Sequence, residues 1–167
     1  EAAVASGSGA LGEDLDAIFA ATEADGDELA RARLAAAAAL ADLGDPVSAA
    51  EHLRLADRAG ESDSLRAAAR YNLAQVHYRR AEALLAPEEG AAPDVAGARG
   101  ALAESAAAFR SVLDVAPGDL EAARNVERVR RMIQRLDEMQ EQARERAERM
   151  REQAEQLENL ADRQQQE

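Results

Sequence analysis

Residues 65–78, LRAAARYNLAQVHY, and residues 105–119, SAAAFRSVLDVAPGD, decide the fold. In both stretches apolar residues recur three and four positions apart, which predicts helices. The second stretch ends at Pro117-Gly118, a pair that stops a helix. Alanine favours helix and buries little area, so a core built from it needs closely packed helices rather than many large side chains. The two stretches therefore predict a pair of packed helices.

These helices resemble one tetratricopeptide repeat, whose pattern is W-x2-L-G-x2-Y on the first helix, then A-x3-F and a closing proline on the second. The residues that match are Leu73, Ala74, His77, Ser105, Phe109, Val112 and Pro117. Arg70 stands where the pattern has tryptophan, so the match is incomplete. The resemblance implies an all-α fold of stacked helical hairpins, which form an α–α superhelix.

The neighbouring segments repeat this unit. Residues 29–59 carry the same pattern with smaller side chains, at Ala36, Ala37, Leu40, Ala49, Leu53 and Ala56. Residues 119–126 restart it, because Asn125-Val126 echoes Asn72-Leu73. Asn72 and Asn125 are 53 residues apart, whereas the repeat period is about 34 residues. The excess predicts an inserted loop over residues 87–97, with Glu88-Glu89 at its tip.

Three segments make up the predicted organisation: a flexible leader over residues 1–12, a repeat domain over residues 13–119 and a long helix over residues 120–167. The leader, with Gly7-Ser8-Gly9, is of the kind that follows a removed signal or anchor. Residues 13–22 have helical spacing and are expected to cover the first repeat. Asp27 is expected to cap the next helix. Gly44-Asp45-Pro46 marks the clearest turn between helices.

Composition excludes several functional classes. The chain has 167 residues and no cysteine, so disulfides, thiol nucleophiles and thiolate metal sites are excluded. No apolar run reaches the roughly 18 residues of a membrane span. The net charge is −13, and all 20 basic residues are arginine. Because phosphate binding needs a basic face, nucleic acid is not an expected partner.

Nothing in the sequence predicts catalysis. Phosphate-binding loops and dinucleotide fingerprints are absent from it, and we expect no enzyme and no cofactor. His52 and His77 are the only histidines, and we expect His77 to pack in the tyrosine position and His52 to lie on the surface. A metal site shared by the two is not expected, since they fall on different predicted helices and zinc needs three or four ligands.

The first helices of such a stack line its concave surface, as the resemblance implies. The residues predicted on this face are Arg31, Leu34, Ala38, Tyr71, Asn72, Gln75, Tyr78, Arg79, Arg124, Asn125, Arg128 and Arg131. They are basic, amide-rich and include both tyrosines of an otherwise acidic chain. One interpretation is a groove for a protein or peptide with acidic character or a free carboxylate. The other is an ordinary solvated face, with Arg124 and Arg128 paired to Glu121 and Glu127.

The last helix carries an apolar seam that steps by three and four residues from Val126 to Ala161, a sustained heptad pattern. Beyond Leu136 the seam holds Gln140 and several alanines, which bury little area. A parallel pair would place Arg146 against Arg151, which disfavours that arrangement. The seam predicts either a solvated helix or a weak antiparallel or heterotypic coiled coil. The second possibility would make residues 120–163 a structural oligomerisation module, the alternative to an adaptor that binds partners through its groove.

Residues 117–127, PGDLEAARNVE, followed by a glutamine-rich end, resemble the tetratricopeptide proteins of bacterial aerotolerance operons. That family accompanies von Willebrand A-domain proteins and a MoxR-type ATPase at the cell envelope. The resemblance implies a bacterial scaffold protein in a periplasmic or envelope-associated complex.

Overall fold

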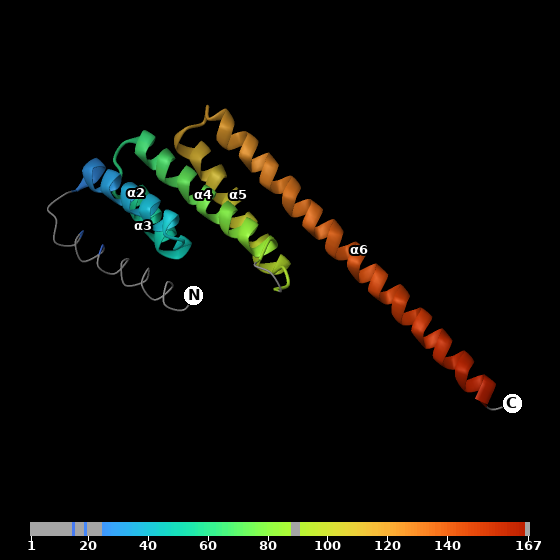
Figure 1. Cartoon of the computed structure of the whole chain (residues 1–167). Helices are drawn as coiled ribbons and strands as arrows, with labels where there is room; N and C mark the ends of the chain where they lie inside the picture. Colours follow the sequence, from blue (N-terminus) through green and yellow to red (C-terminus); the bar gives the residue numbers. More distant parts are fainter. Residues whose placement is uncertain (1–14, 16–18, 20–24, 88–90, 166–167) are drawn as a thin grey trace. The chain divides into compact units, whose positions relative to one another are not determined.

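A computed structural model describes residues 15, 19, 25–87 and 91–165 (Figure 1). Its helices are α2 (Gly26–Asp42), α3 (Pro46–Ala59), α4 (Asp63–Leu85), α5 (Val95–Val115) and α6 (Leu120–Gln165). No strand occurs among these described residues, and the all-α prediction is confirmed. None of the described helices has a stretch apolar and long enough to cross a bilayer.

Several predicted features fall where the structure gives little description. The leader over residues 1–12 and the loop tip at residues 88–90 lie outside the described residues. Of the predicted covering helix, only Leu15 and Phe19 are described, and both are helical. The predicted loop over residues 87–97 ends earlier than expected, because α5 begins at Val95.

Contacts divide the chain into two compact units, residues 1–131 and residues 132–167. In the first unit α2 packs on α3 and α4 packs on α5, while α3 also contacts α4. The core of this unit consists mainly of alanines together with Leu40, Leu102, Phe109 and Val112. Small side chains at the helix contacts let the helix axes approach closely, so a few large residues are enough to fill the remaining space.

The turn between α2 and α3 forms as predicted. Gly44 has φ +81°, a left-handed conformation that glycine adopts without steric cost. Asp45 accepts a hydrogen bond from the backbone N–H of Ser48 at 3.0 Å, and Pro46 occupies the first helical turn. Proline is favoured there because its missing N–H would have no partner in the helix. The local sequence alone therefore determines this turn.

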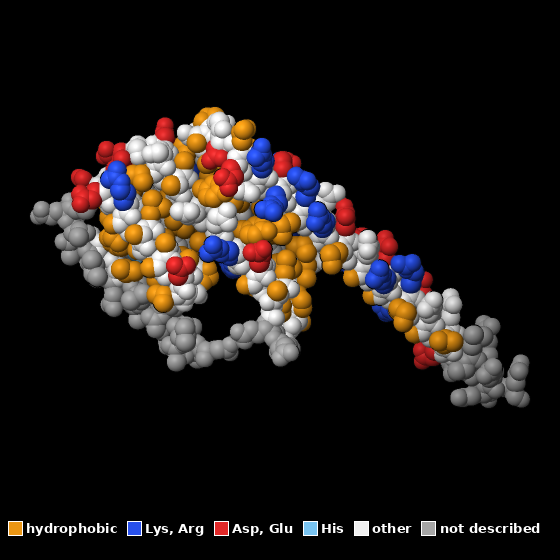
Figure 2. Space-filling model, turned by 45° about the horizontal axis from the view of Figure 1, so that its top comes forward, with side chains coloured by type: hydrophobic (Ala, Val, Ile, Leu, Met, Phe, Trp, Pro, Cys, Tyr) orange, Lys and Arg blue, Asp and Glu red, His pale blue; other side chains and the backbone are white. Residues whose placement is uncertain are grey.

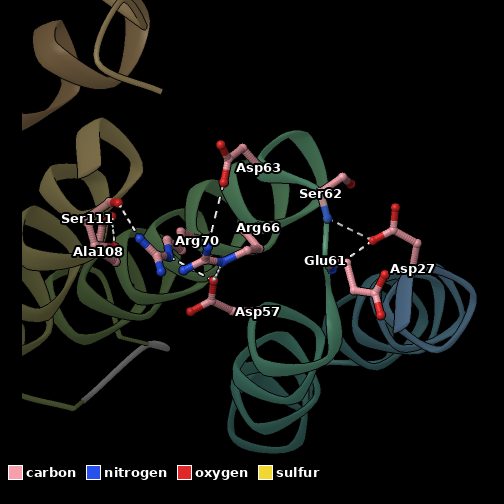
Figure 3. A network of polar contacts seen from close by, with 9 residues as sticks. All are labelled: Asp27, Asp57, Glu61, Ser62, Asp63, Arg66, Arg70, Ala108 and Ser111. Carbon is pink, nitrogen blue, oxygen red and sulfur yellow. Dashed lines mark hydrogen bonds and ion pairs between the residues drawn. The ribbon is translucent and has the colours of Figure 1, made fainter. Parts of the chain in front are cut away.

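The predicted role of Asp27 is wrong. Asp25 occupies the N-cap position of α2, and Asp27 lies inside the helix. Its carboxylate accepts hydrogen bonds from the backbone N–H groups of Glu61 (2.8 Å) and Ser62 (3.0 Å), just before α4 begins (Figure 3). These bonds, chiefly the one from Ser62, lower the pKa of Asp27. Asp27 thus ties α2 to the start of α4 and leaves its own helix uncapped by a side chain.

Arg70, which replaces the tryptophan of the repeat pattern, links three helices. Its Nε donates to Asp57 of α3 at 2.8 Å, and its Nη1 donates to the carbonyl of Ser111 in α5 at 2.7 Å. Arg66 lies 3.7 Å from the same Asp57 carboxylate (Figure 3). Charge-assisted hydrogen bonds of this kind are about twice as strong as neutral ones. A polar network therefore occupies a place where the pattern would put an aromatic ring.

The expectation that His52 lies on the surface is wrong, because only 1% of it is exposed. Arg33 approaches its Nδ1 at 3.1 Å, and since arginine has no acceptor, the ring nitrogen accepts. The Phe19 ring packs at a tilt against the His52 ring, with centroids 5.6 Å apart. The Arg33 guanidinium lies over the Phe19 ring, 4.4 Å from its centroid. Phe19 and Arg33 thus both contribute to the burial of His52.

His77 is buried, as predicted, and its Nδ1 lies 3.0 Å from a carboxylate oxygen of Glu104 in α5. Burial lowers the pKa of His77 below 6.5, and Arg54 and Arg80 act in the same direction while Glu104 opposes them. The neutral ring can still donate its Nδ1–H to Glu104. Burial between α4 and α5 therefore favours the uncharged form of His77.

This burial predicts a pH-dependent loss of stability. The folded state disfavours the protonated His77 ring. The contribution of His77 to the free energy of unfolding is therefore complete above the unfolded pKa of 6.5. It is lost as the pH falls through the lower folded pKa. We expect the free energy of unfolding to decline on acidification below that value, and to decline less in His77→Leu. Urea titrations at a series of pH values measure the difference. Identical pH profiles for the two chains would contradict a buried neutral His77.

In the second unit α6 continues from Met132, and none of residues 132–158 is buried. Ion pairs within the helix join Arg144 to Glu141 (3.9 Å), Arg149 to Glu145 (3.9 Å) and Arg151 to Glu155 (3.6 Å). Side chains of both charges lie along α6 (Figure 2). Such pairs stabilise a helix by about 0.2–0.5 kcal/mol each.

Candidate functional site

A groove of about 270 Å³ runs between α2 and α4. Its α2 side consists of Leu34, three alanines and, at the end of the helix, Asp42. Leu53 of α3 also lines it, and its α4 side is mostly polar. The lining residues are Leu34, Ala37, Ala38, Ala41, Asp42, Leu53, Asn72, Gln75, Val76 and Arg79. The groove exists because alanines on α2 leave space that larger side chains would fill. Its chemistry is an apolar wall that faces two amides and an arginine.

Most of the predicted site residues gather at three neighbouring hollows rather than in one. Asn72, Gln75 and Arg79 line the groove between α2 and α4. Gln75, Tyr78, Asn125 and Arg128 line a hollow of about 30 Å³ beside Phe109. Tyr71 and Asn72 line a third, with Asp119 and Glu121. Gln75 and Asn72 are shared between hollows, so one face of α4 connects all three.

Arg31 and Arg124 line none of these three hollows. The side chain of Arg31 is 65% exposed and lies 4.0 Å from Asp27, one helical turn away. Arg124 is exposed on α6. Both residues were predicted from helical periodicity, which gives the face of a helix but not the height of the hollow along it.

Tyr71 is already engaged by other residues of the chain. Its hydroxyl donates to Glu121 at 2.7 Å and accepts from the amide of Asn125 at 3.0 Å. Its ring packs edge-on against Phe109, with centroids 5.2 Å apart. Partial burial, together with the Glu121 carboxylate, raises the pKa of Tyr71. The ring therefore joins α4 to the core, and a ligand would have to displace Glu121 to reach the hydroxyl.

Three arginines of the predicted concave face have no acidic partner among the residues that the structure describes. No carboxylate of the described chain lies within 4.0 Å of the guanidinium groups of Arg79, Arg124 or Arg128. The predicted alternative, in which Glu121 and Glu127 neutralise Arg124 and Arg128, does not occur. Glu121 accepts from Tyr71 and Glu127 pairs with Arg130 at 3.0 Å. Positive charge is thus left available on a protein whose net charge is −13.

Sequence reasoning missed Asp42, Leu53 and the acidic end of the face. Asp42 is the last residue of α2 and lines the same groove as Arg79. Asp119 and Glu121 line the hollow beside Tyr71, so the α4 face is acidic toward the start of the helix and basic toward its end. The helical pattern of α4 contained no signal for these residues, because they belong to other segments of the chain.

The two histidines have separate surroundings, at Arg33 and Glu104 respectively. Within the described part of the chain no group of three or more histidine or carboxylate side chains could hold a metal ion.

Comparisons of the sequence with protein-family models and curated proteins, and of the structure with solved structures, found no match.

Proposed function

We propose that the first unit is a tetratricopeptide-like adaptor that binds a segment of another protein in the groove between α2 and α4. Support comes from the positions that the repeat pattern reserves for packing. Five of the six matched pairs are buried: Ala37 and Ala74, Leu40 and His77, Ala49 and Ser105, Leu53 and Phe109, and Ala56 and Val112. The sixth pair, Ala36 and Leu73, is half-buried. Two hairpins that bury equivalent positions are what a repeat requires.

Close helix packing in the second hairpin also favours a repeat. The Ser105 hydroxyl of α5 donates to the backbone carbonyl of Ala74 in α4 at 2.9 Å. A side chain as short as serine reaches the neighbouring backbone only where the two helices touch. The pattern has small residues at both places, so the contact explains why they are needed.

The observation that carries the binding proposal is the grouping of Asn72, Gln75 and Arg79 opposite the alanine wall. A side-chain amide offers both donors and an acceptor, which suits the backbone of an extended peptide. The guanidinium of Arg79, which has no acidic partner in the described part of the chain, suits a carboxylate. The apolar wall suits small aliphatic side chains. The ligand class that fits is therefore a peptide segment with an acidic side chain or a free C-terminal carboxylate.

Peptide selection tests this proposal without a known partner. Peptides selected from a display library on the intact chain are expected to be acidic and to bind Arg79→Glu about tenfold more weakly, because an attractive charge becomes repulsive. Fluorescence anisotropy measures the affinities. The affinity of each selected peptide is compared with that of the same peptide carrying a C-terminal amide. A loss on amidation indicates that the groove binds the free carboxylate rather than an acidic side chain.

Arg110→Glu is the matched control, because Arg110 is exposed on α5 and lines none of the described hollows. It makes the same charge change elsewhere on the first unit and should leave affinity unchanged apart from a general salt-dependent effect. Equal losses for Arg79→Glu and Arg110→Glu, or no loss for either, would contradict binding in this groove.

Resemblance of residues 117–127 to the aerotolerance-operon proteins suggests where such an adaptor acts. On this proposal the partner belongs to a bacterial envelope complex with von Willebrand A-domain proteins and a MoxR-type ATPase. Purification of the tagged chain from its native host, in parallel with Arg79→Glu, tests it. Recovery of such proteins with the unaltered chain and their loss with the variant would support it.

A further inference from the structure

The second unit presents an apolar seam that is half-buried at Ile133, Leu136 and Gln140 and exposed from Ala143 to Leu157. Its members are Ile133, Leu136, Gln140, Ala143, Ala147, Met150, Ala154 and Leu157. Met150 is 66% and Leu157 68% exposed, and none of the others is buried. Most helical stability in proteins comes from packing an apolar face, and a heptad seam about 36 Å long is the pattern of a helix that packs on another helix.

We infer that this seam packs against the same seam of a second copy, antiparallel, with the two-fold axis near Glu145. A two-fold interface uses the same surface patch of both copies. The seam of one copy must therefore fit the same seam of the other copy running in the opposite direction. Here it does, because the seam has large residues at its ends and small residues in its middle.

Side-chain sizes favour this register. With the axis near Glu145, Ile133 faces Leu157 of the second copy and Leu136 faces Ala154. Gln140 then faces Met150, and Ala143 faces Ala147 at the centre. Each large residue of the seam meets an apolar or amide side chain of the other copy, and the central alanines let the helices approach closely. The four large apolar residues of the seam are all covered.

Charges beside the seam favour the same register. Antiparallel packing brings Asp137 against Arg151 of the second copy, and the symmetry makes this opposite-charge contact twice. Arg144 and Arg146 each meet their own copy once at the axis, where Arg144 also has Glu141 at 3.9 Å on its own helix. In the parallel pair Arg146 meets Arg151 twice, and no opposite charges meet beside the seam.

Neighbouring antiparallel registers fit less well. A shift of one heptad in one direction sets Asp137 against Glu158 and Arg144 against Arg151, each twice, and all four contacts are between like charges. A shift in the other direction sets Leu157 against Val126, which is already buried in the first unit with 5% exposed. In the register near Glu145 the opposite charges meet, and Leu157 faces Ile133, which is not buried.

Charge reversal on the full chain tests the orientation. In the antiparallel pair Arg151→Asp and Asp137→Arg each replace two attractive contacts with two repulsive ones, and we expect about tenfold weaker dimerisation from each. The double variant restores attraction and should dimerise like the unaltered chain. In a parallel pair Arg151→Asp would instead strengthen association, because it would face Arg146. Sedimentation equilibrium gives the constants.

Matched controls keep the charge change and move it off the seam. Arg149→Asp removes a pair with Glu145 at 3.9 Å, as Arg151→Asp removes one with Glu155 at 3.6 Å, but Arg149 lies on the outer side of the heptad. Glu138→Arg is the corresponding control for Asp137→Arg. Neither control should change dimerisation by more than about twofold.

Disulfide trapping gives an independent readout, since the chain has no cysteine of its own. When Leu136→Cys and Ala154→Cys chains are mixed under mild oxidation, we expect the mixed disulfide to dominate. A parallel pair would hold these positions about 27 Å apart along the helix and give only like-with-like disulfides. The inference is overturned if the chain stays monomeric at high concentration. It is also overturned if the like-with-like disulfide dominates, or if the double variant does not recover dimerisation.

Discussion

Phe109→Ala is expected to lower the free energy of unfolding by about 3–5 kcal/mol, the usual range for a buried phenylalanine. Phe109 is only 2% exposed and is the largest fully buried side chain of the described residues. The edge of the Tyr71 ring packs against it at 5.2 Å. In a core of alanines few neighbours can move to fill the space, so the cavity should persist. Urea unfolding followed by circular dichroism measures the loss.

The control for Phe109→Ala is Leu120→Ala, which removes an apolar side chain that is 69% exposed. Substitutions at such surface positions usually change stability by no more than about 0.5 kcal/mol. If Phe109→Ala destabilised the chain no more than Leu120→Ala, the packing of α4 on α5 described here would be wrong. An unchanged midpoint with a changed slope would point instead to altered residual structure in the unfolded chain.

Ala74→Leu is expected to destabilise the first unit by about 2–3 kcal/mol, toward the upper end of the usual cost of overpacking. Ala74 is 0% exposed, and Ser105 of α5 lies 2.9 Å from its carbonyl oxygen. A leucine would need space at the contact between α4 and α5 where Ser105 reaches the Ala74 carbonyl. The helices would have to separate, although leucine itself is a good helix former. Thermal unfolding followed by circular dichroism measures the change.

Ala83→Leu makes the same substitution on the exposed side of α4 and should be nearly neutral. Equal melting temperatures for Ala74→Leu and the unaltered chain would show that the hairpin does not need a small residue there. The repeat interpretation would then lose its main packing argument. Peptide binding by Arg79→Glu is a separate measurement, because Arg79 is exposed and its reversal should affect binding rather than folding.

Helix bounds were largely predictable, because the signals that set them lie within a few residues of each end. Gly44, Asp45 and Pro46 determine their turn through left-handed backbone, side-chain capping and fixed φ. Asp94 likewise caps α5 by accepting from the N–H of Gly97 at 2.8 Å. The pattern around Phe109 also identified its buried neighbours. Even so, local signals misled at Asp27, since a residue that suits an N-cap can equally accept from another segment.

The candidate site was only partly predictable. Asn72, Gln75 and Arg79, which helical periodicity put on one face, line the same groove beside α4. Helical periodicity did not reveal that Glu121 takes up the Tyr71 hydroxyl, or that Asp42 shares the groove with Arg79. Those residues come from other helices, and their positions depend on how helices cross. The ion pairing of Arg124 and Arg128 depended in the same way on which partners the Glu121 and Glu127 carboxylates contact.

The sequence by itself determined an all-helical chain, the ends of its main helices and the small and large positions of its hairpins. These properties follow from alanine content, helix period and capping, which act over one or two turns. Only the tertiary structure decided that Asp27 bonds to Glu61, 34 residues away, that His52 is buried, and that Asn125 meets Tyr71 across 54 residues. Such contacts depend on the angle and depth at which helices pack, and many residues set these together, so no local pattern encodes them.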